Sequence, residues 1–191
     1  MSHLTGFQKW WNNALPHRIH IRRHVPKFLS TCPDPLRGEI LELGAGHGWT
    51  SRTILETFPH VELTCAEVDQ SAQDVFQDLQ ATYGSRLKIQ QADIRSLPFD
   101  RESFQVVIAI NTIGYIDEAE VQRVLREALR VLRQGGLLGI SDLTVARMPS
   151  FARRTLVEKT LLEEGCELEY IRRGARFSLW ARKPGVDPEL Y

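Results

Sequence analysis

The stretch EILELGAGHGWT, residues 39–50, joins a short apolar run to three glycines that stand two positions apart. An apolar run of this length predicts a buried strand, and the glycines predict a tight turn into a following helix. Glycines at such a turn let a ligand approach the backbone more closely than a side chain would allow. Glu42, two residues before Gly44, indicates a ligand that carries positive charge. The stretch therefore predicts a ligand site at the end of a strand.

Four more apolar runs of strand length follow this one. The five expected strands are residues 39–43, 61–66, 87–92, 104–110 and 137–141. Between them, apolar residues repeat at helical spacing from Ala72 to a stop at Gly84, and from Val121 through Leu132 to a pair of glycines. Strands that alternate with helices predict βαβ units and a parallel sheet with right-handed crossovers.

The chain closes with a different pattern. A helix expected over residues 150–164 ends at Gly165, and two strand-like runs then flank Arg173-Gly174. These runs predict a hairpin at one edge of the sheet. The predicted fold class is α/β, a Rossmann-like doubly wound, mostly parallel sheet with one antiparallel edge strand in the C-terminal hairpin. We expect a single domain over residues 37–191 and a helical N-terminal extension, or lid, over residues 1–36.

Composition bounds the function without identifying it. Of the 191 residues, 42% are hydrophobic, and 24 Lys+Arg balance 24 Asp+Glu, so the net charge is 0 and strong nucleic-acid affinity is disfavoured. Cys32, Cys65 and Cys166 are scattered without CxxC spacing, which predicts reduced thiols and no metal site. No stretch approaches the roughly 18 apolar residues that a membrane span needs. We expect a soluble cytoplasmic protein.

Polar residues follow three more of the expected strands. Glu67 and Asp69 come after the second strand, Asp93 after the third and Asn111 after the fourth. Parallel sheets bind ligands at the carboxyl ends of their strands, where an acid can accept both hydroxyl groups of a ribose. We choose Glu67 for that role and expect Asp69 to cap the next helix, although the sequence leaves the alternative open.

This set resembles the class I S-adenosylmethionine-dependent methyltransferases. ILELGAGHG is similar to their first motif, AEVDQS to their ribose acid and ADIRSLPF to their adenine loop. SFQVVIAINTIGYI and VLREALRVLRQGGLLGISD resemble the fourth strand and the helix, turn and strand after it. The resemblance covers residues 39–142, and Gln105 and Gln134 depart from the usual Asp and Pro at positions away from the rim.

The resemblance implies S-adenosylmethionine as cofactor and a role for each matching residue. Glu42, Gly44, Ala45 and Gly46 would surround the methionine moiety. Glu67 would hold the ribose, and Val68 would lie against the adenine face. Asp93 and Ile94 would contact the adenine edge, and Asn111 would line the floor near the sulfonium.

The resemblance also implies the reaction, which is methyl transfer to an O, N or S atom of a small, possibly anionic molecule. Proximity and orientation dominate this chemistry, and the sequence identifies no catalytic residue. The alternatives are a lipid headgroup, RNA or protein substrate, or a non-catalytic protein that binds S-adenosylmethionine. DNA is disfavoured because NTIG stands where base-directed members carry [DN]PP[YF].

The N-terminal extension is the main uncommitted segment. It is basic and free of acids before Asp34, which fits an anionic substrate, RNA or a membrane surface, the last two less favoured. His17, His20 and His24 share one face of the expected helix. They are metal ligands, substrate contacts or partly exposed side chains with hydrogen bonds, and we prefer the last interpretation. Trp10-Trp11 either roof the site or attach the extension to the domain. Further candidates for substrate contact, chosen by position, are Tyr115, Asp117, Asp142 and Arg147.

Overall fold

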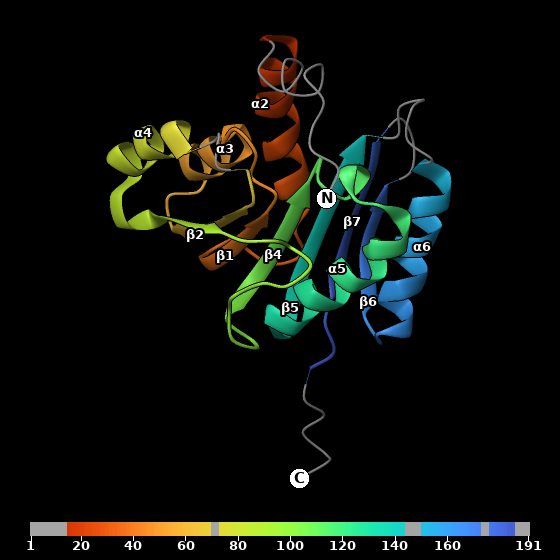
Figure 1. The fold of residues 1–191 in the computed structure, drawn as a ribbon. Coiled ribbons are helices and arrows are strands. Elements are labelled where there is room, and N and C mark those ends of the chain that lie inside the picture. The colour runs from red at the N-terminus through yellow and green to blue at the C-terminus, as the bar shows by residue number, and fades with distance from the viewer. Residues whose placement is uncertain (1–14, 70–72, 144–149, 173–175, 186–191) are drawn as a thin grey trace.

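The computed structural model describes residues 15–69, 73–143, 150–172 and 176–185. Its centre is a seven-stranded sheet in the order β3-β2-β1-β4-β5-β7-β6 (Figure 1). The strands are β1 Gly38–Leu43, β2 Val61–Glu67, β3 Leu87–Gln91, β4 Phe104–Ile110, β5 Leu132–Leu143, β6 Glu167–Arg172 and β7 Arg176–Arg182.

The pairing of the strands confirms the predicted fold class. The first five strands pair in parallel. β7 runs antiparallel to both β5 and β6, so it is the reversed strand of the hairpin and β6 lies outermost. The order reverses between β1 and β4, which places the predicted ligand site at the topological switch point of the sheet.

Helices cover both faces of the sheet (Figure 1). The α-helices are α2 Leu15–Leu29, α3 Trp49–Thr57, α4 Gln73–Tyr83, α5 Glu118–Val131 and α6 Ser150–Glu163, with short 3-10 turns η2 Gly84–Arg86 and η3 Ile113–Tyr115. α2, α3 and α4 contribute to one core cluster, and α5 and α6 to the other. Because both faces of the sheet are buried, the central strand β4 is apolar except at Gln105.

The junction between α5 and β5 differs from the prediction. The helical pattern ran to Leu132 and the strand was expected only from residue 137, but α5 ends at Val131 and β5 begins at Leu132. Leu132 adopts an extended backbone and pairs with Phe104 of β4. This pairing across the sheet, which helical spacing does not reveal, ends the helix early.

The N-terminal helix α2 is part of the hydrophobic core of the domain. Its Phe28 stacks on Trp180 of β7 with ring centroids 4.9 Å apart, and the Trp180 indole donates to Thr31 Oγ1 at 3.1 Å. Gly139 of β5 makes room for this indole, since a Cβ there would lie 2.5 Å from the ring. Pro26 lies in the last turn of α2 and did not prevent a 15-residue helix. The predicted boundary between residues 36 and 37 stays a prediction.

The described residues contain no helix that is both long and apolar enough to cross a membrane. Trp10-Trp11 and Arg147 lie outside the described residues. The same holds for the side chains of His17 and His20, which belong to the part of α2 whose side chains are not described.

Candidate functional site

The three glycines of the opening stretch turn out to have three different surroundings. All three have positive φ angles, of 65° at Gly44, 54° at Gly46 and 69° at Gly48. A Cβ on Gly44 would lie 2.6 Å from Thr112 Cγ2, and one on Gly48 would lie 2.6 Å from Leu79 Cδ1. A Cβ on Gly46 would meet nothing within 4 Å. Of the three, Gly46 alone has open space where a Cβ would stand, whereas Gly44 and Gly48 are close to the side chains of Thr112 and Leu79. The predicted contacts of Gly44 and Gly46 with the cofactor stay predictions.

Glu67, at the end of β2, is bonded to the glycine turn. Its Oε2 accepts from Gly46 N at 2.7 Å, and its Oε1 accepts from Val68 N and Asp69 N at 2.8 Å each. Val68, which follows it, is an unusually exposed apolar side chain, at 38%. The arrangement puts a carboxylate and an apolar surface next to the open backbone of Gly46. This placement supports Glu67 over Asp69 as the ribose acid, a role that stays a prediction.

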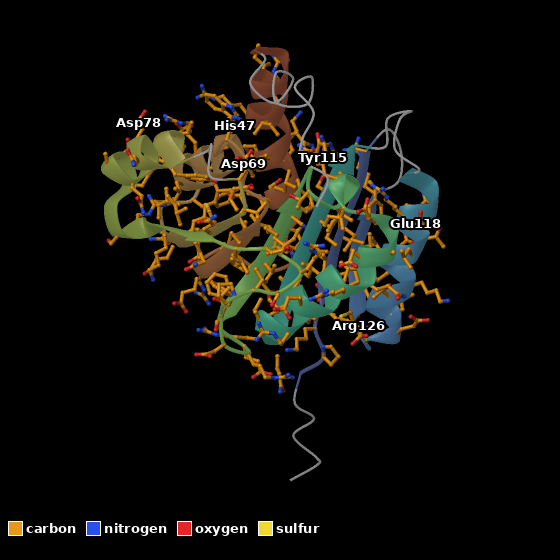
Figure 2. The ribbon with its side chains drawn as sticks, in the orientation of Figure 1. His47, Asp69, Asp78, Tyr115, Glu118 and Arg126 are labelled. Atoms are coloured by element: carbon orange, nitrogen blue, oxygen red, sulfur yellow. The ribbon has the colours of Figure 1, made fainter. Side chains whose placement is uncertain are left out.

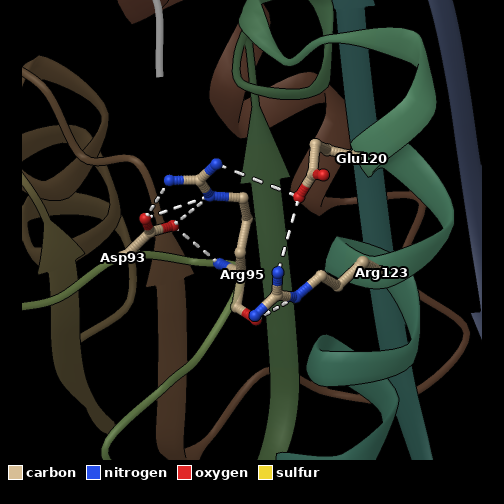
Figure 3. A network of polar contacts seen from close by, with 4 residues as sticks. All are labelled: Asp93, Arg95, Glu120 and Arg123. Atoms are coloured by element: carbon tan, nitrogen blue, oxygen red, sulfur yellow. Dashed lines mark hydrogen bonds and ion pairs between the residues drawn. The ribbon is translucent and has the colours of Figure 1, made fainter.

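The loop after β3 holds the two residues predicted at the adenine edge. Asp93 accepts from Arg95 N, Nε and Nη2 at 2.6 to 3.0 Å, and this pairing lowers the pKa of the Asp93 carboxyl. Arg95 also faces Glu120, which pairs with Arg123 (Figure 3). The Ile94 side chain is buried in the core, at 3% exposure. Ion pairs thus fix the position of this loop; its contact with adenine stays a prediction.

Glu42 lies below the turn, under α3. It is 2% exposed, and its Oε2 accepts from Ser51 Oγ at 2.6 Å with Cys65 Sγ at 3.6 Å. Burial raises the pKa of the Glu42 carboxyl to about 7, against the opposing effect of the Ser51 hydrogen bond. Its predicted contact with the positive end of a ligand stays a prediction.

A cavity of about 60 Å³ lies above the glycine turn and gathers residues from several elements. It is lined by Ile21, Gly44, Ala45, Gly46, His47, Trp49, Thr50, Ile110, Asn111 and Tyr115. Four of these were predicted at the cofactor site and Tyr115 at the substrate. Ile21, on α2, shows that the N-terminal helix reaches the site. His47, Asp69 and Tyr115 lie along the upper edge of the sheet (Figure 2).

A larger cavity, of about 840 Å³, lies over α5 at the other end of the molecule. Arginines line much of it, and none of the predicted site residues does. We assign the ligand site to the smaller cavity, because it lies at the carboxyl ends of the strands and borders the open side of Gly46.

Three further candidates from the sequence, Asp142, Asp117 and His24, make hydrogen bonds or cap a helix near the site. Asp142 is buried below the loop after β4, where it accepts from Ile113 N at 3.2 Å and Gly114 N at 3.3 Å. Burial raises the pKa of its carboxyl to about 6. Asp117 stands at the N-cap of α5, and His24 Nε2 lies 2.8 Å from Ser141 Oγ. Among the described residues there is no cluster of three His, Cys, Asp or Glu that could hold a metal ion.

Sequence reasoning missed Arg176 of β7, which donates from Nη1 to Asn111 Oδ1 at 2.9 Å. Burial lowers the pKa of its guanidinium to about 10. A charged residue at the start of an otherwise buried strand was the one available signal, and it does not say which residue the side chain meets.

Comparison with known proteins identifies the family. A family model described as a methyltransferase domain matches residues 40–136, half of the chain, and includes the glycine turn, Glu67 and Asn111. The chain belongs to the class I S-adenosylmethionine-dependent methyltransferases. S-adenosylmethionine is therefore the cofactor that its family and fold imply.

Individual relatives of this methyltransferase are distant. Demethylmenaquinone methyltransferase of Clavibacter sepedonicus is 32% identical over 62% of this chain and 47% of its own. The 27-O-demethylrifamycin SV methyltransferase of Amycolatopsis mediterranei is 26% identical over 81% of this chain and 57% of its own. The chain spans about half the length of the curated relatives it matches.

Solved structures agree on the fold. A SAM-dependent methyltransferase from Aquifex aeolicus superposes with a TM-score of 0.71 over 94% of this chain and 99% of its own, at 14% identity. The [4+2]-cyclase SpnF superposes with a TM-score of 0.69 over 87% of this chain and 80% of its own, at 19% identity. At such identities the likeness concerns the fold alone.

The residues at the turn fit the cofactor. The carboxylate of Glu67 and the exposed side chain of Val68 would hold its nucleoside part, and the open backbone of Gly46 would lie against its methionine part. The N-terminus of α3 beside the cavity suits its carboxylate, because free N–H groups there attract anions.

A Gly46→Ala substitution separates ligand approach from backbone strain. We expect the free energy of unfolding to fall by about 1 kcal/mol, because alanine is strained at positive φ. The affinity for S-adenosylhomocysteine, measured by calorimetry, should also fall, since the methyl group occupies the open space over the turn. Gly84→Ala is the matched control, with φ 57° and no atom within 4 Å of its Cβ, but before the start of β3 and so away from the carboxyl ends of the strands. Equal losses of affinity in both variants would contradict the assignment of Gly46.

Proposed function

We propose that this methyltransferase transfers the methyl group of S-adenosylmethionine to an O, N or S atom of a small molecule. The observation that carries the proposal is the bond between Glu67 and the open glycine turn, beside a cavity at the switch point of the sheet. When bound, the cofactor supplies an electrophilic methyl group on a sulfonium.

The chain's own residues contribute by enclosing the reactants and orienting them. Ile21, Trp49 and Tyr115 come from three different elements and enclose the cavity, so they exclude water and restrict the approach of an acceptor. Burial and the nearby Asp142 raise the pKa of the Tyr115 hydroxyl, so it stays protonated near neutral pH and acts as a hydrogen-bond donor. We assign no general base, because a nucleophile that ionises readily does not need one.

The small-molecule class is supported by charge and by relatives. The neutral chain has no polyelectrolyte character, which disfavours RNA and DNA. Demethylmenaquinone and 27-O-demethylrifamycin SV appear in the names of two relatives, whereas another, at 21% identity, is named release factor glutamine methyltransferase. Lipid, RNA and protein acceptors, and cofactor binding without turnover, are the outcomes against which the proposal is tested.

The test is incubation of the protein with a methyl-labelled donor and a whole extract of its host, followed by separation into small-molecule, lipid, RNA and protein fractions. We expect label in the small-molecule fraction, and a loss of that label with Glu67→Gln. Label confined to another fraction would overturn the substrate class. Binding of S-adenosylhomocysteine without any labelled product would instead favour the non-catalytic alternative.

A further inference from the structure

Asn111 combines two unusual features at the rim of the site. Its φ of 55° lies in the left-handed region, which residues other than glycine seldom occupy. Its backbone N donates to Ser141 O at 2.8 Å, so this strained residue is bonded to β5. Strained positions of this kind concentrate at ligand sites, because the surrounding structure must hold them.

Arg176 fixes the orientation of the Asn111 amide. A guanidinium only donates hydrogen bonds, so the atom at 2.9 Å from Arg176 Nη1 must be the amide oxygen. Arg176 Nη1 also reaches Ser141 O at 3.3 Å, which ties the pair to β5. The Nδ2 group of Asn111 therefore points away from the guanidinium as an oriented donor.

That donor has no partner among the described residues. Asn111 Nδ2 is buried and makes no hydrogen bond, and the same is true of His47 Nδ1. Both residues line the cavity above the glycine turn. A buried donor without a partner is costly, and two unpaired polar atoms at one cavity point to a ligand with polar atoms of its own.

The position of Asn111 separates this ligand from the nucleoside. Glu67 and Val68 stand at the end of β2, whereas Asn111 follows β4 and is held by residues of β5 and β7. The N-terminus of α3, on the β1 side of the cavity, already offers donors to a cofactor carboxylate. Asn111 thus lies at a different strand end from Glu67 and Val68.

We propose that Asn111 donates a hydrogen bond to a carbonyl or carboxylate oxygen of the methyl-accepting substrate, with Arg176 as the residue that positions its amide. The acceptor class is a compound that carries such an oxygen next to its nucleophilic atom, as in an ortho-hydroxy acid. This inference rests on the proposed function and makes its substrate more specific.

The test uses salicylate, which has a hydroxyl beside a carboxylate, and protein saturated with S-adenosylhomocysteine. Binding is measured by NMR titration of the wild type, Asn111→Asp and Ser178→Ala. Ser178→Ala is the control, because Ser178 shares a hydrogen bond with Ser141 Oγ at 2.8 Å but does not line the cavity. Aspartate tolerates the left-handed backbone and still accepts from Arg176, but replaces the donor with a carboxylate oxygen. We expect wild type and Ser178→Ala to bind salicylate alike, and Asn111→Asp to bind it at least tenfold more weakly with little change in affinity for S-adenosylhomocysteine.

Arg176 is tested as a positioning residue by conservative rescue. Arg176→Met should weaken salicylate binding severalfold, because the amide is then free to turn, and Arg176→Lys should recover much of the loss. Equal effects of Met and Lys would show a merely structural role and overturn the assignment of Arg176.

Three results would overturn the assignment of Asn111. The first is no salicylate binding by the wild-type complex, and the second is equal binding by Asn111→Asp. The third is an Asn111→Asp variant that loses affinity for S-adenosylhomocysteine but not for 5′-methylthioadenosine, which lacks the carboxylate; the oxygen would then be the cofactor's. A wild type that fails to bind S-adenosylhomocysteine would contradict the proposed function itself.

Discussion

Glu67→Gln is expected to weaken the binding of S-adenosylhomocysteine by about 10- to 150-fold, corresponding to the roughly 1.5–3 kcal/mol of a lost charged hydrogen bond. The carboxylate accepts from three backbone N–H groups, of Gly46, Val68 and Asp69. Glutamine keeps one acceptor oxygen but has an NH2 group in place of the other. That group faces a backbone N–H and cannot accept a hydrogen bond from a ribose hydroxyl. The substitution therefore removes a ligand contact and loosens the turn together.

Calorimetric titration of the wild type, Glu67→Gln and Asp69→Asn measures the effect. Asp69→Asn is the matched control, because it makes the same chemical change two residues away and leaves the Glu67 carboxylate in place. If Asp69→Asn lost the affinity and Glu67→Gln kept it, the ribose would belong to Asp69. Adenosine should show the same ranking as S-adenosylhomocysteine, because the contact concerns the nucleoside.

The free energy of unfolding of Glu42→Gln is expected to rise, relative to that of the wild type, by about 3 kcal/mol between pH 4 and pH 8. The pKa of Glu42 is about 7 in the folded protein against 4.5 for the free group. Between these two values the folded state holds the proton more tightly than the unfolded state, so wild-type stability falls as the pH rises through this window. Below the window and above it, this carboxyl contributes no slope, and glutamine does not titrate.

Urea unfolding of both proteins from pH 4 to pH 8 measures this difference, and subtracting the two curves removes the other titrating groups. Ser51→Ala gives a second test. The Ser51 hydroxyl donates to the Glu42 carboxylate and favours its charged form, so its loss should extend the fall in stability to higher pH. A difference between Glu42→Gln and wild type that does not vary with pH would show that the carboxyl is not buried in this way.

The same Glu42→Gln variant tests the sequence interpretation of this acid. If the carboxylate attracts the positive end of the cofactor, the variant gains stability at pH 8 but loses affinity for S-adenosylhomocysteine. If its role is confined to Ser51 and Cys65, only the stability changes.

The sequence predicted the parts of the fold that local pattern controls. The strands of the parallel sheet follow from apolar runs, and the place of Glu67 at the end of β2 follows from the second of these runs. β4, predicted as residues 104–110, has those bounds in the structure. The end of α5 was predicted one residue late because Leu132 has a partner, Phe104, that is distant in sequence.

What the sequence could not show depends on partners from elsewhere in the chain. Gly44 and Gly48 look the same as Gly46, but Thr112 and Leu79, which lie close to them, are far away in sequence. From the sequence, Glu42 is interpreted as a ligand contact, but in the structure its carboxylate contacts Ser51 and Cys65. The contact of Arg176 with Asn111 arises because β7 pairs with β5, and the sequence does not show this pairing.

The stacking of Phe28 on Trp180 has a consequence for how the protein is made. The first described helix completes its core against β7, which is the last of the described strands in chain order and also the one that β6 needs as a neighbour. On the ribosome, the apolar side of residues 15–29 must wait for residues 176–182 to emerge from the exit tunnel. A nascent chain arrested before that point should expose this helix to chaperones, and release of the last segment should bury it.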